Sequence, residues 1–206
     1  MAQQRLTSVF LFVQLLCLVL SDEQTTTEWE YKYEDYAFNQ FMNTSEPIWV
    51  VNTTQPQAPL CTKDVNSNMT INNETFFTRS YKKGDEYTHK QLKGEFGYHD
   101  EGKAKMFDRM TVFEVQGGEY VDDEVLEYVS HGDKCAVVTV MAYINSDTKV
   151  WRDVRVRNAY LNDTTSNEYK ECLKRFADIL KVTNKNWTSP YSEECEGASS
   201  ETNKTP

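Results

Sequence analysis

Apolar and polar residues alternate in short runs along most of the chain, and clusters of turn-forming residues separate these runs. The alternation repeats every two residues, which is the period of strands buried on one face. The separators, such as KKGDE, QGGE and SHGDK, are rich in Gly, Asp and Ser. The pattern predicts strands at residues 47–54, 61–71, 75–81, 87–96, 104–115, 119–130, 135–144 and 150–158.

After residue 165 the period changes to that of a helix. Thr165 and Glu168 have the spacing of a capping box, in which the hydroxyl and the carboxylate satisfy N–H groups of the first turn. A helix from Ser166 to Val182 is therefore expected. Its apolar face contains Tyr169, Cys172, Leu173, Phe176, Ile179 and Leu180.

Together these elements predict a mainly β fold. Eight short strands with regular turns suit an eight-stranded antiparallel barrel, which can enclose one small ligand. The C-terminal α-helix must pack on the outside, because its apolar stripe needs a sheet face to cover.

The N-terminus adds a targeting signal. Arg5 precedes an apolar run from Val9 to Leu20 that is too short to cross a bilayer core of about 30 Å. We predict a signal peptide at 1–21, one domain at 22–196 and a disordered tail at 197–206. No second long apolar run follows, so the mature chain is expected to be secreted, extracellular and without a membrane span.

Four cysteines remain after the signal peptide, and an even number in an oxidising compartment indicates two disulfides. None of the four lies near another in sequence, unlike the close pairs of zinc sites. Cys172 lies on the buried helix face, and Cys135 opens the strand expected beneath it. This predicts Cys135–Cys172 and leaves Cys61–Cys195.

The charge and the sequons describe the surface. A net charge of −10 argues against nucleic acid or an anionic membrane as partners. Asn-x-Ser/Thr motifs in a secreted chain mark exposed glycosylation sites. They occur at Asn43, Asn52, Asn68, Asn73, Asn162, Asn186 and Asn203.

Alternation also predicts which residues face the barrel interior. If Cys135 points outward to the helix, Val138 and Val140 point inward. If Asn52 faces solvent to carry a glycan, Trp49 and Val51 point inward. These four apolar residues are the expected wall of a ligand cavity.

Several motifs resemble a known family. EPIWVV shortly precedes the first of the four cysteines, DEVLEY shortly precedes the second, ECLKRF contains the third and YSEECEG the fourth. In these features the chain resembles tick salivary lipocalins of the histamine-binding type, including the Japanin-like immune modulators. The resemblance implies a lipocalin barrel, the same two disulfides, and a role in modulating host immune cells such as dendritic cells.

The chain departs from the amine-binding members of that family. Ala136 replaces the Asp that follows the cysteine of this strand, and WRDVRVR (151–157) replaces a Glu-Leu-Trp triplet. Glu124 falls where a family carboxylate would lie, but we expect it at the rim or in solvent. The carboxylates that could still neutralise a buried amine are Glu124, Asp153, Glu114 and Asp108.

We therefore predict a carrier of a mostly apolar ligand, a sterol or lipid such as cholesterol, that modulates host immune and inflammatory responses. The alternative is sequestration of histamine or serotonin, and an alternative of another class is surface binding to a host immune protein or cell. No histidine pair has metal-ligand spacing, and no Gly-x-Ser-x-Gly motif or phosphate loop occurs. The sequence thus predicts no enzyme, no cofactor and no metal site.

Overall fold

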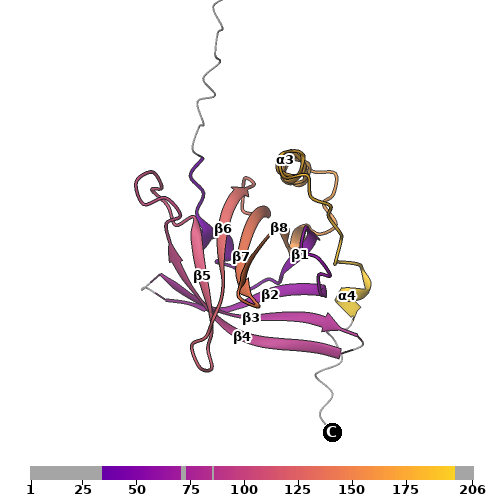
Figure 1. Cartoon of the computed structure of the whole chain (residues 1–206). Coiled ribbons are helices and arrows are strands. Elements are labelled where there is room, and N and C mark those ends of the chain that lie inside the picture. Colours follow the sequence, from indigo (N-terminus) through magenta and orange to yellow (C-terminus); the bar gives the residue numbers. More distant parts are fainter. Residues whose placement is uncertain (1–33, 71–72, 85, 198–206) are drawn as a thin grey trace, which may run out of the picture. The chain divides into compact units, whose positions relative to one another are not determined.

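The computed structural model describes residues 34–70, 73–84 and 86–197. Its strands form a closed antiparallel barrel in which each strand pairs with the next and β8 closes onto β1 (Figure 1). The predicted fold class is confirmed. The strands are β1 Ile48–Thr53, β2 Leu60–Met69, β3 Glu74–Lys83, β4 Glu86–Gly97, β5 Arg109–Glu114, β6 Tyr120–Val129, β7 Cys135–Ile144 and β8 Asp147–Arg157.

The signal peptide predicted at 1–21 lies outside the described residues, as does the predicted tail apart from Gly197. Both remain expectations from the sequence. Among the described residues, no helix combines the length and the apolar composition needed to cross a membrane.

Most strand boundaries differ from the prediction by one or two residues, and two differ by more. β5 begins at Arg109 rather than at Ala104, because the Asp35 carboxylate accepts the N–H groups of Lys105 and Met106 and holds this segment in a loop. β8 begins at Asp147 rather than at Val150. The two-residue turn before it has positive φ angles of 53° and 63°, which is the geometry of a tight hairpin that lets pairing start at once.

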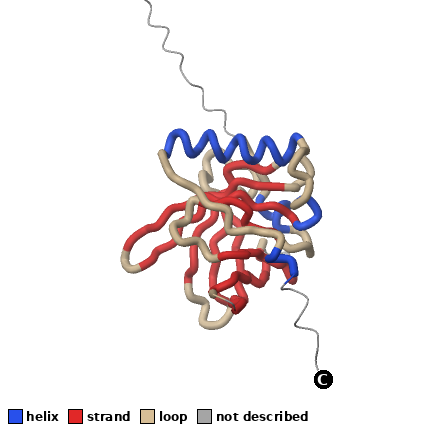
Figure 2. Tube along the Cα trace, turned by 90° about the vertical axis from the view of Figure 1, so that its right-hand side faces the viewer, coloured by secondary structure: helices blue, strands red, loops and turns tan. Residues whose placement is uncertain are grey.

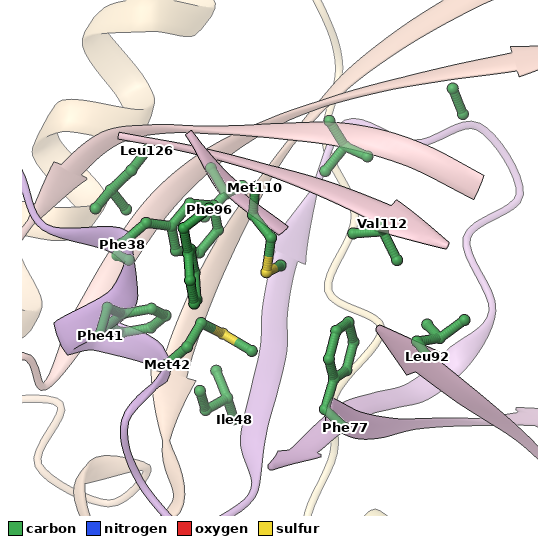
Figure 3. Packing of buried hydrophobic residues seen from close by; sticks show 14 of the residues in the cluster. Phe38, Phe41, Met42, Ile48, Phe77, Leu92, Phe96, Met110, Val112 and Leu126 are labelled. Carbon is green, nitrogen blue, oxygen red and sulfur yellow. The ribbon is translucent and has the colours of Figure 1, made fainter. Parts of the chain in front are cut away.

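The up-and-down order divides the barrel into two ends. The β1–β2, β3–β4, β5–β6 and β7–β8 connections lie at one end, called here the mouth. The other end is filled by a short helix, α2 (Phe38–Met42), which the sequence pattern did not predict. Its side chains Phe38, Phe41 and Met42 are fully buried among inward-facing residues of the strands (Figure 3).

Hydrogen bonds hold α2 in the barrel. The Phe38 N–H donates to the Phe107 carbonyl at 2.7 Å, and the Arg157 guanidinium donates to the carbonyls of Gln40 and Phe41 at 2.9 and 2.8 Å. Burial of two phenylalanine rings and a methionine stabilises this arrangement by several kcal/mol at about 1.5–3 kcal/mol per side chain. Among the described residues, these side chains therefore take up space inside the end of the barrel opposite the mouth.

Helix α3 (Asn167–Thr183) lies outside the barrel and packs against β6, β7 and β8 (Figure 2). Its N-cap is Ser166, whose Oγ accepts the Tyr169 N–H at 3.2 Å. The predicted capping role of Thr165 is therefore wrong by one residue. Asn184 ends the helix in the left-handed conformation that favours helix termination.

Both predicted disulfides are present. Cys135–Cys172 joins β7 to α3 with Cα atoms 6.4 Å apart, and Cys61–Cys195 joins β2 to α4 (Glu194–Gly197) with Cα atoms 5.2 Å apart. The second bridge holds the C-terminal segment along β1, where the Thr188 backbone pairs with that of Thr53.

Candidate binding site inside the barrel

The interior of the mouth half carries charged side chains rather than a purely apolar lining. Carboxylates and guanidinium groups from four strands meet there, and all are buried or nearly so. Two of the strands supply residues two positions apart, which alternation directs to the same face. This charge cluster consists of Asp64 on β2, Arg79 on β3, Asp122 and Glu124 on β6, and Asp153 and Arg155 on β8.

The two arginines are held by close, partly bidentate contacts. Arg79 donates from Nε and Nη2 to the two oxygens of Asp64, each at 2.8 Å, and also to Glu124 Oε1 at 2.8 Å. Arg155 donates from Nη1 and Nη2 to the two oxygens of Glu124 at 2.6 and 2.7 Å. Charge-assisted bidentate contacts of this kind are the strongest hydrogen bonds that side chains make.

The cluster contains more negative than positive groups. Four carboxylates face two guanidinium groups, so the formal charge is −2 when all are ionised. The excess falls on Asp122 and Asp153. Asp122 meets Arg79 only at 3.3 Å, and its Oδ1 has no hydrogen-bond partner among the described residues. Asp153 accepts from the Thr53 hydroxyl at 2.7 Å and meets Arg155 only at 3.4 Å.

The pKa values show the same imbalance. Burial, reinforced by the negative charge of Glu124, raises the pKa of Asp122 to about 7. Burial also raises the pKa of Asp153. Burial acts on Glu124 in the same direction, but the adjacent Arg155 and Arg79 outweigh it and hold the pKa of Glu124 at about 2. The two carboxylates with raised pKa values, Asp122 and Asp153, are therefore the two that lack a closely paired guanidinium group.

Asp122 and Asp153 line a cavity of about 360 Å³ at the mouth. Apolar and aromatic side chains supply much of the remaining wall. These are Val50, Tyr81, Val121, Val140, Ala142, Ile144 and Trp151. Three cations also line the cavity: Arg79 and Arg155, which pair within the cluster, and Lys90, which pairs with Glu114. The cavity thus offers two carboxylates that lack a closely paired cation of their own, beside aromatic and aliphatic surface, which suits a small molecule that carries one positive charge.

No family model matches the sequence, and no curated protein matches it. Solved structures do match. AM182 in complex with serotonin has a TM-score of 0.55 at 13% identity, covering 79% of this chain and 94% of that one. Apocrustacyanin C2 has a TM-score of 0.52 at 12% identity, covering 78% and 83%. The chain has the lipocalin fold.

In this lipocalin barrel, the predicted ligand-binding residues occupy different places. Val140 lines the cavity. Val138 lies in the buried inner cluster that also contains the α2 side chains, and it does not line the cavity. Glu124 is fully buried between two arginines, so the expected rim or solvent position is wrong.

Trp49 and Val51 do not face the interior. Both lie in the outer cluster that includes the two disulfides and α3. The Trp49 indole N–H donates to Asn158 Oδ1 at 2.9 Å, and its ring meets that of Tyr191 with centroids 5.3 Å apart. The prediction failed because it counted strict alternation back from Asn52, whereas the pairing of β1 with β8 shifts register between Val50 and Asn52.

The sequons differ in exposure. Asn43, Asn68, Asn73, Asn162 and Asn186 are exposed. Asn52 is half-buried, and Asn203 lies outside the described residues. Glycosylation at the seven sites remains a prediction.

Sequence reasoning missed most of the charge cluster. It considered Glu124 and Asp153 but not Asp64, Asp122 or the two arginines. The available signal was the spacing of Asp122 with Glu124 and of Asp153 with Arg155, since residues two positions apart on one strand point to the same face. Asp108 and Glu114, the other two candidates, bind elsewhere: Asp108 accepts the His99 N–H, and Glu114 pairs with Lys90.

Proposed function

We propose that the protein is a carrier, not an enzyme, and that it binds a small organic amine in the barrel cavity. The observation that carries this proposal is the net negative charge cluster whose unpaired oxygen, Asp122 Oδ1, belongs to a residue of the cavity wall. An ammonium ion loses its hydration on entering a cavity, and a buried carboxylate must compensate for that loss. Asp122 and Asp153 together supply such compensation.

The rest of the cavity suits the organic part of an amine. Trp151 and Tyr81 offer aromatic surface, and Val140 and Ala142 offer aliphatic surface. Aromatic faces also attract cations by about 0.5–2 kcal/mol, depending on exposure. Serotonin, named in the AM182 complex, combines an aromatic ring with one amine and is a suitable first probe.

A sterol or lipid, which the sequence favoured, now becomes the alternative. Of the four apolar residues expected in the wall, only Val140 lines the cavity, and α2 occupies the closed half of the barrel. An uncharged ligand would also leave Asp122 Oδ1 buried without a partner, at a cost of about 1–3 kcal/mol.

The proposed setting is extracellular. The predicted signal peptide, the two disulfides and the resemblance to salivary lipocalins support a secreted protein that removes a host amine and so dampens inflammation. A protein that sequesters an amine must bind it tightly, so the measured affinity for the amine tests this function.

Calorimetric titration with serotonin, histamine and cholesterol tests the proposal. We expect an amine to bind and Asp122→Asn to weaken that binding about 10- to 100-fold, because a charged hydrogen bond contributes about 1.5–3 kcal/mol. Asp178→Asn, an exposed site on α3, is the matched control and should leave affinity unchanged. Uptake of cholesterol with no amine binding would restore the lipid alternative, and binding of none would favour a surface partner.

Amine affinity should also depend on pH. Asp122, whose pKa burial raises to about 7, must lose a proton before it can pair with an ammonium ion. Affinity should therefore rise with pH below about 7 and level off above it, since the amine itself stays protonated over this range. Titrations between pH 5.5 and 8.5, about this pKa, should show the trend in the parent and a weaker trend in Asp122→Asn. A flat profile in the parent would contradict a role for Asp122.

A further inference from the structure

A second and larger hollow lies outside the cavity at the mouth. It has a volume of about 920 Å³ and is called here the outer groove. Three chain segments form it: the β1–β2 connection, the β7–β8 hairpin with the start of β8, and the segment that follows α3. The lining residues fall at 53–57, 144, 148–151 and 185–188.

The outer groove is a separate compartment from the cavity. The two share only Gln55, Ile144 and Trp151, which form the wall between them. No residue of the charge cluster is part of the groove lining, although the hydroxyl of Thr53, which lines the groove, donates to Asp153 at 2.7 Å. A ligand in the groove would therefore meet different chemistry from a ligand in the cavity.

The charged groups of the groove differ from those of the cavity, whose wall contains Asp122 and Asp153 together with Arg79, Lys90 and Arg155. Its only charged lining residues in the described part of the chain are Lys149 and Lys185. Lys185 donates from Nζ to the Val150 carbonyl at 2.6 Å, so its charge is held at the groove wall. Lys149 pairs with Asp147 in an exposed contact at 2.5 Å, which contributes little. This positive patch lies in a chain whose net charge is −10.

The groove also exposes large apolar side chains. Trp187 is 52% exposed, Ile144 43% and Val150 37%, and the buried Trp151 supplies a second indole ring. Contiguous exposed apolar surface beside polar residues marks a binding surface more often than chance exposure does. An apolar wall that ends in two ammonium groups fits a molecule with an apolar body and one negative charge.

We propose that the outer groove is a second ligand site, which binds an amphipathic monoanion such as an alkyl carboxylate. The carboxylate lies near Lys149 and Lys185, and the alkyl chain packs against Trp187, Val150 and Ile144. This inference does not depend on the proposed amine site, because the lysines and Trp187 belong to the groove alone.

Decanoate and decylammonium, which share one alkyl chain and differ in charge, are the probes. All proteins carry Asn186→Gln, so that no sugar on this groove residue covers the site. Decanoate should bind and change the tryptophan fluorescence. Trp187→Ala should weaken binding at least about 10-fold through the lost apolar contact, and Lys149→Gln with Lys185→Gln should weaken it about 3- to 10-fold. Lys174→Gln with Lys181→Gln, two exposed lysines of α3, is the matched control and should have no effect.

Repeating the titrations in the Asp122→Asn background separates the two sites. Decanoate affinity should not change in this background, whereas amine binding in the cavity should fall. The groove proposal is overturned if decanoate does not bind, if both lysine pairs behave alike, or if decylammonium binds Asp122→Asn as tightly as decanoate does. None of these results bears on the amine site, whose failure would appear in the serotonin titration alone.

Discussion

Replacement of Arg155 by methionine is expected to lower the free energy of unfolding by about 3–5 kcal/mol, because it leaves buried carboxylates without their counter-charge. The Arg155 side chain is only 3% exposed and donates two hydrogen bonds to Glu124. Without it, four carboxylates face Arg79 alone. Urea denaturation at neutral pH measures the loss.

Arg175→Met is the matched control. Arg175 lies on α3, is 40% exposed in its side chain, and pairs with Glu34 and Glu171 at 3.2 Å each. Exposed pairs contribute about 0–1 kcal/mol, so this variant should lose little stability. The double variant Glu124→Gln with Arg155→Met should lose less than the sum of the single variants, since the two residues contact each other. A loss below about 1 kcal/mol for Arg155→Met would show that the cluster is hydrated and not buried as described.

Loss of the Cys61–Cys195 bridge should have an effect of similar size. Its cysteines are separated by 134 residues, against 37 for Cys135–Cys172. In the chain-entropy account, closing the longer loop contributes about 5 kcal/mol and the shorter about 4 kcal/mol. We therefore expect Cys61→Ala with Cys195→Ala to lower the unfolding free energy more than Cys135→Ala with Cys172→Ala, as measured by urea denaturation.

The two disulfide variants should also differ in which part of the chain becomes accessible to a protease. Without Cys61–Cys195, the C-terminal segment keeps only its noncovalent contacts, such as that of Tyr191 with Trp49. Limited proteolysis should then cut this segment first. A greater loss of stability from the shorter bridge would indicate that docking of α3, rather than loop closure, decides the contribution of each disulfide.

The proposed amine site and the outer groove would place two binding sites of different chemistry at the mouth of one barrel. The incompletely paired carboxylates inside and the two lysines outside come from neighbouring segments, with Trp151 between them. The two proposals can be tested separately, because the amine site depends on Asp122 and the outer groove depends on Lys149, Lys185 and Trp187.

The sequence by itself determined those helices and strands whose apolar residues recur with a regular period. The alternation in 135–144 predicted β7 with its observed bounds, and the helical stripe around Cys172 and Phe176 predicted α3 and its place outside the barrel. These predictions succeeded because each element buries one face, so the period of its apolar residues records its structure directly.

Tertiary structure alone decided the rest. All residues from Ile48 to Val51 are buried, some by the interior and some by the C-terminal segment, so composition could not tell the two faces of β1 apart. The short helix α2 has too few residues to show a helical period. The charge cluster is buried because Arg79 and Arg155 meet carboxylates from other strands, and such pairing over long sequence distances leaves no local pattern.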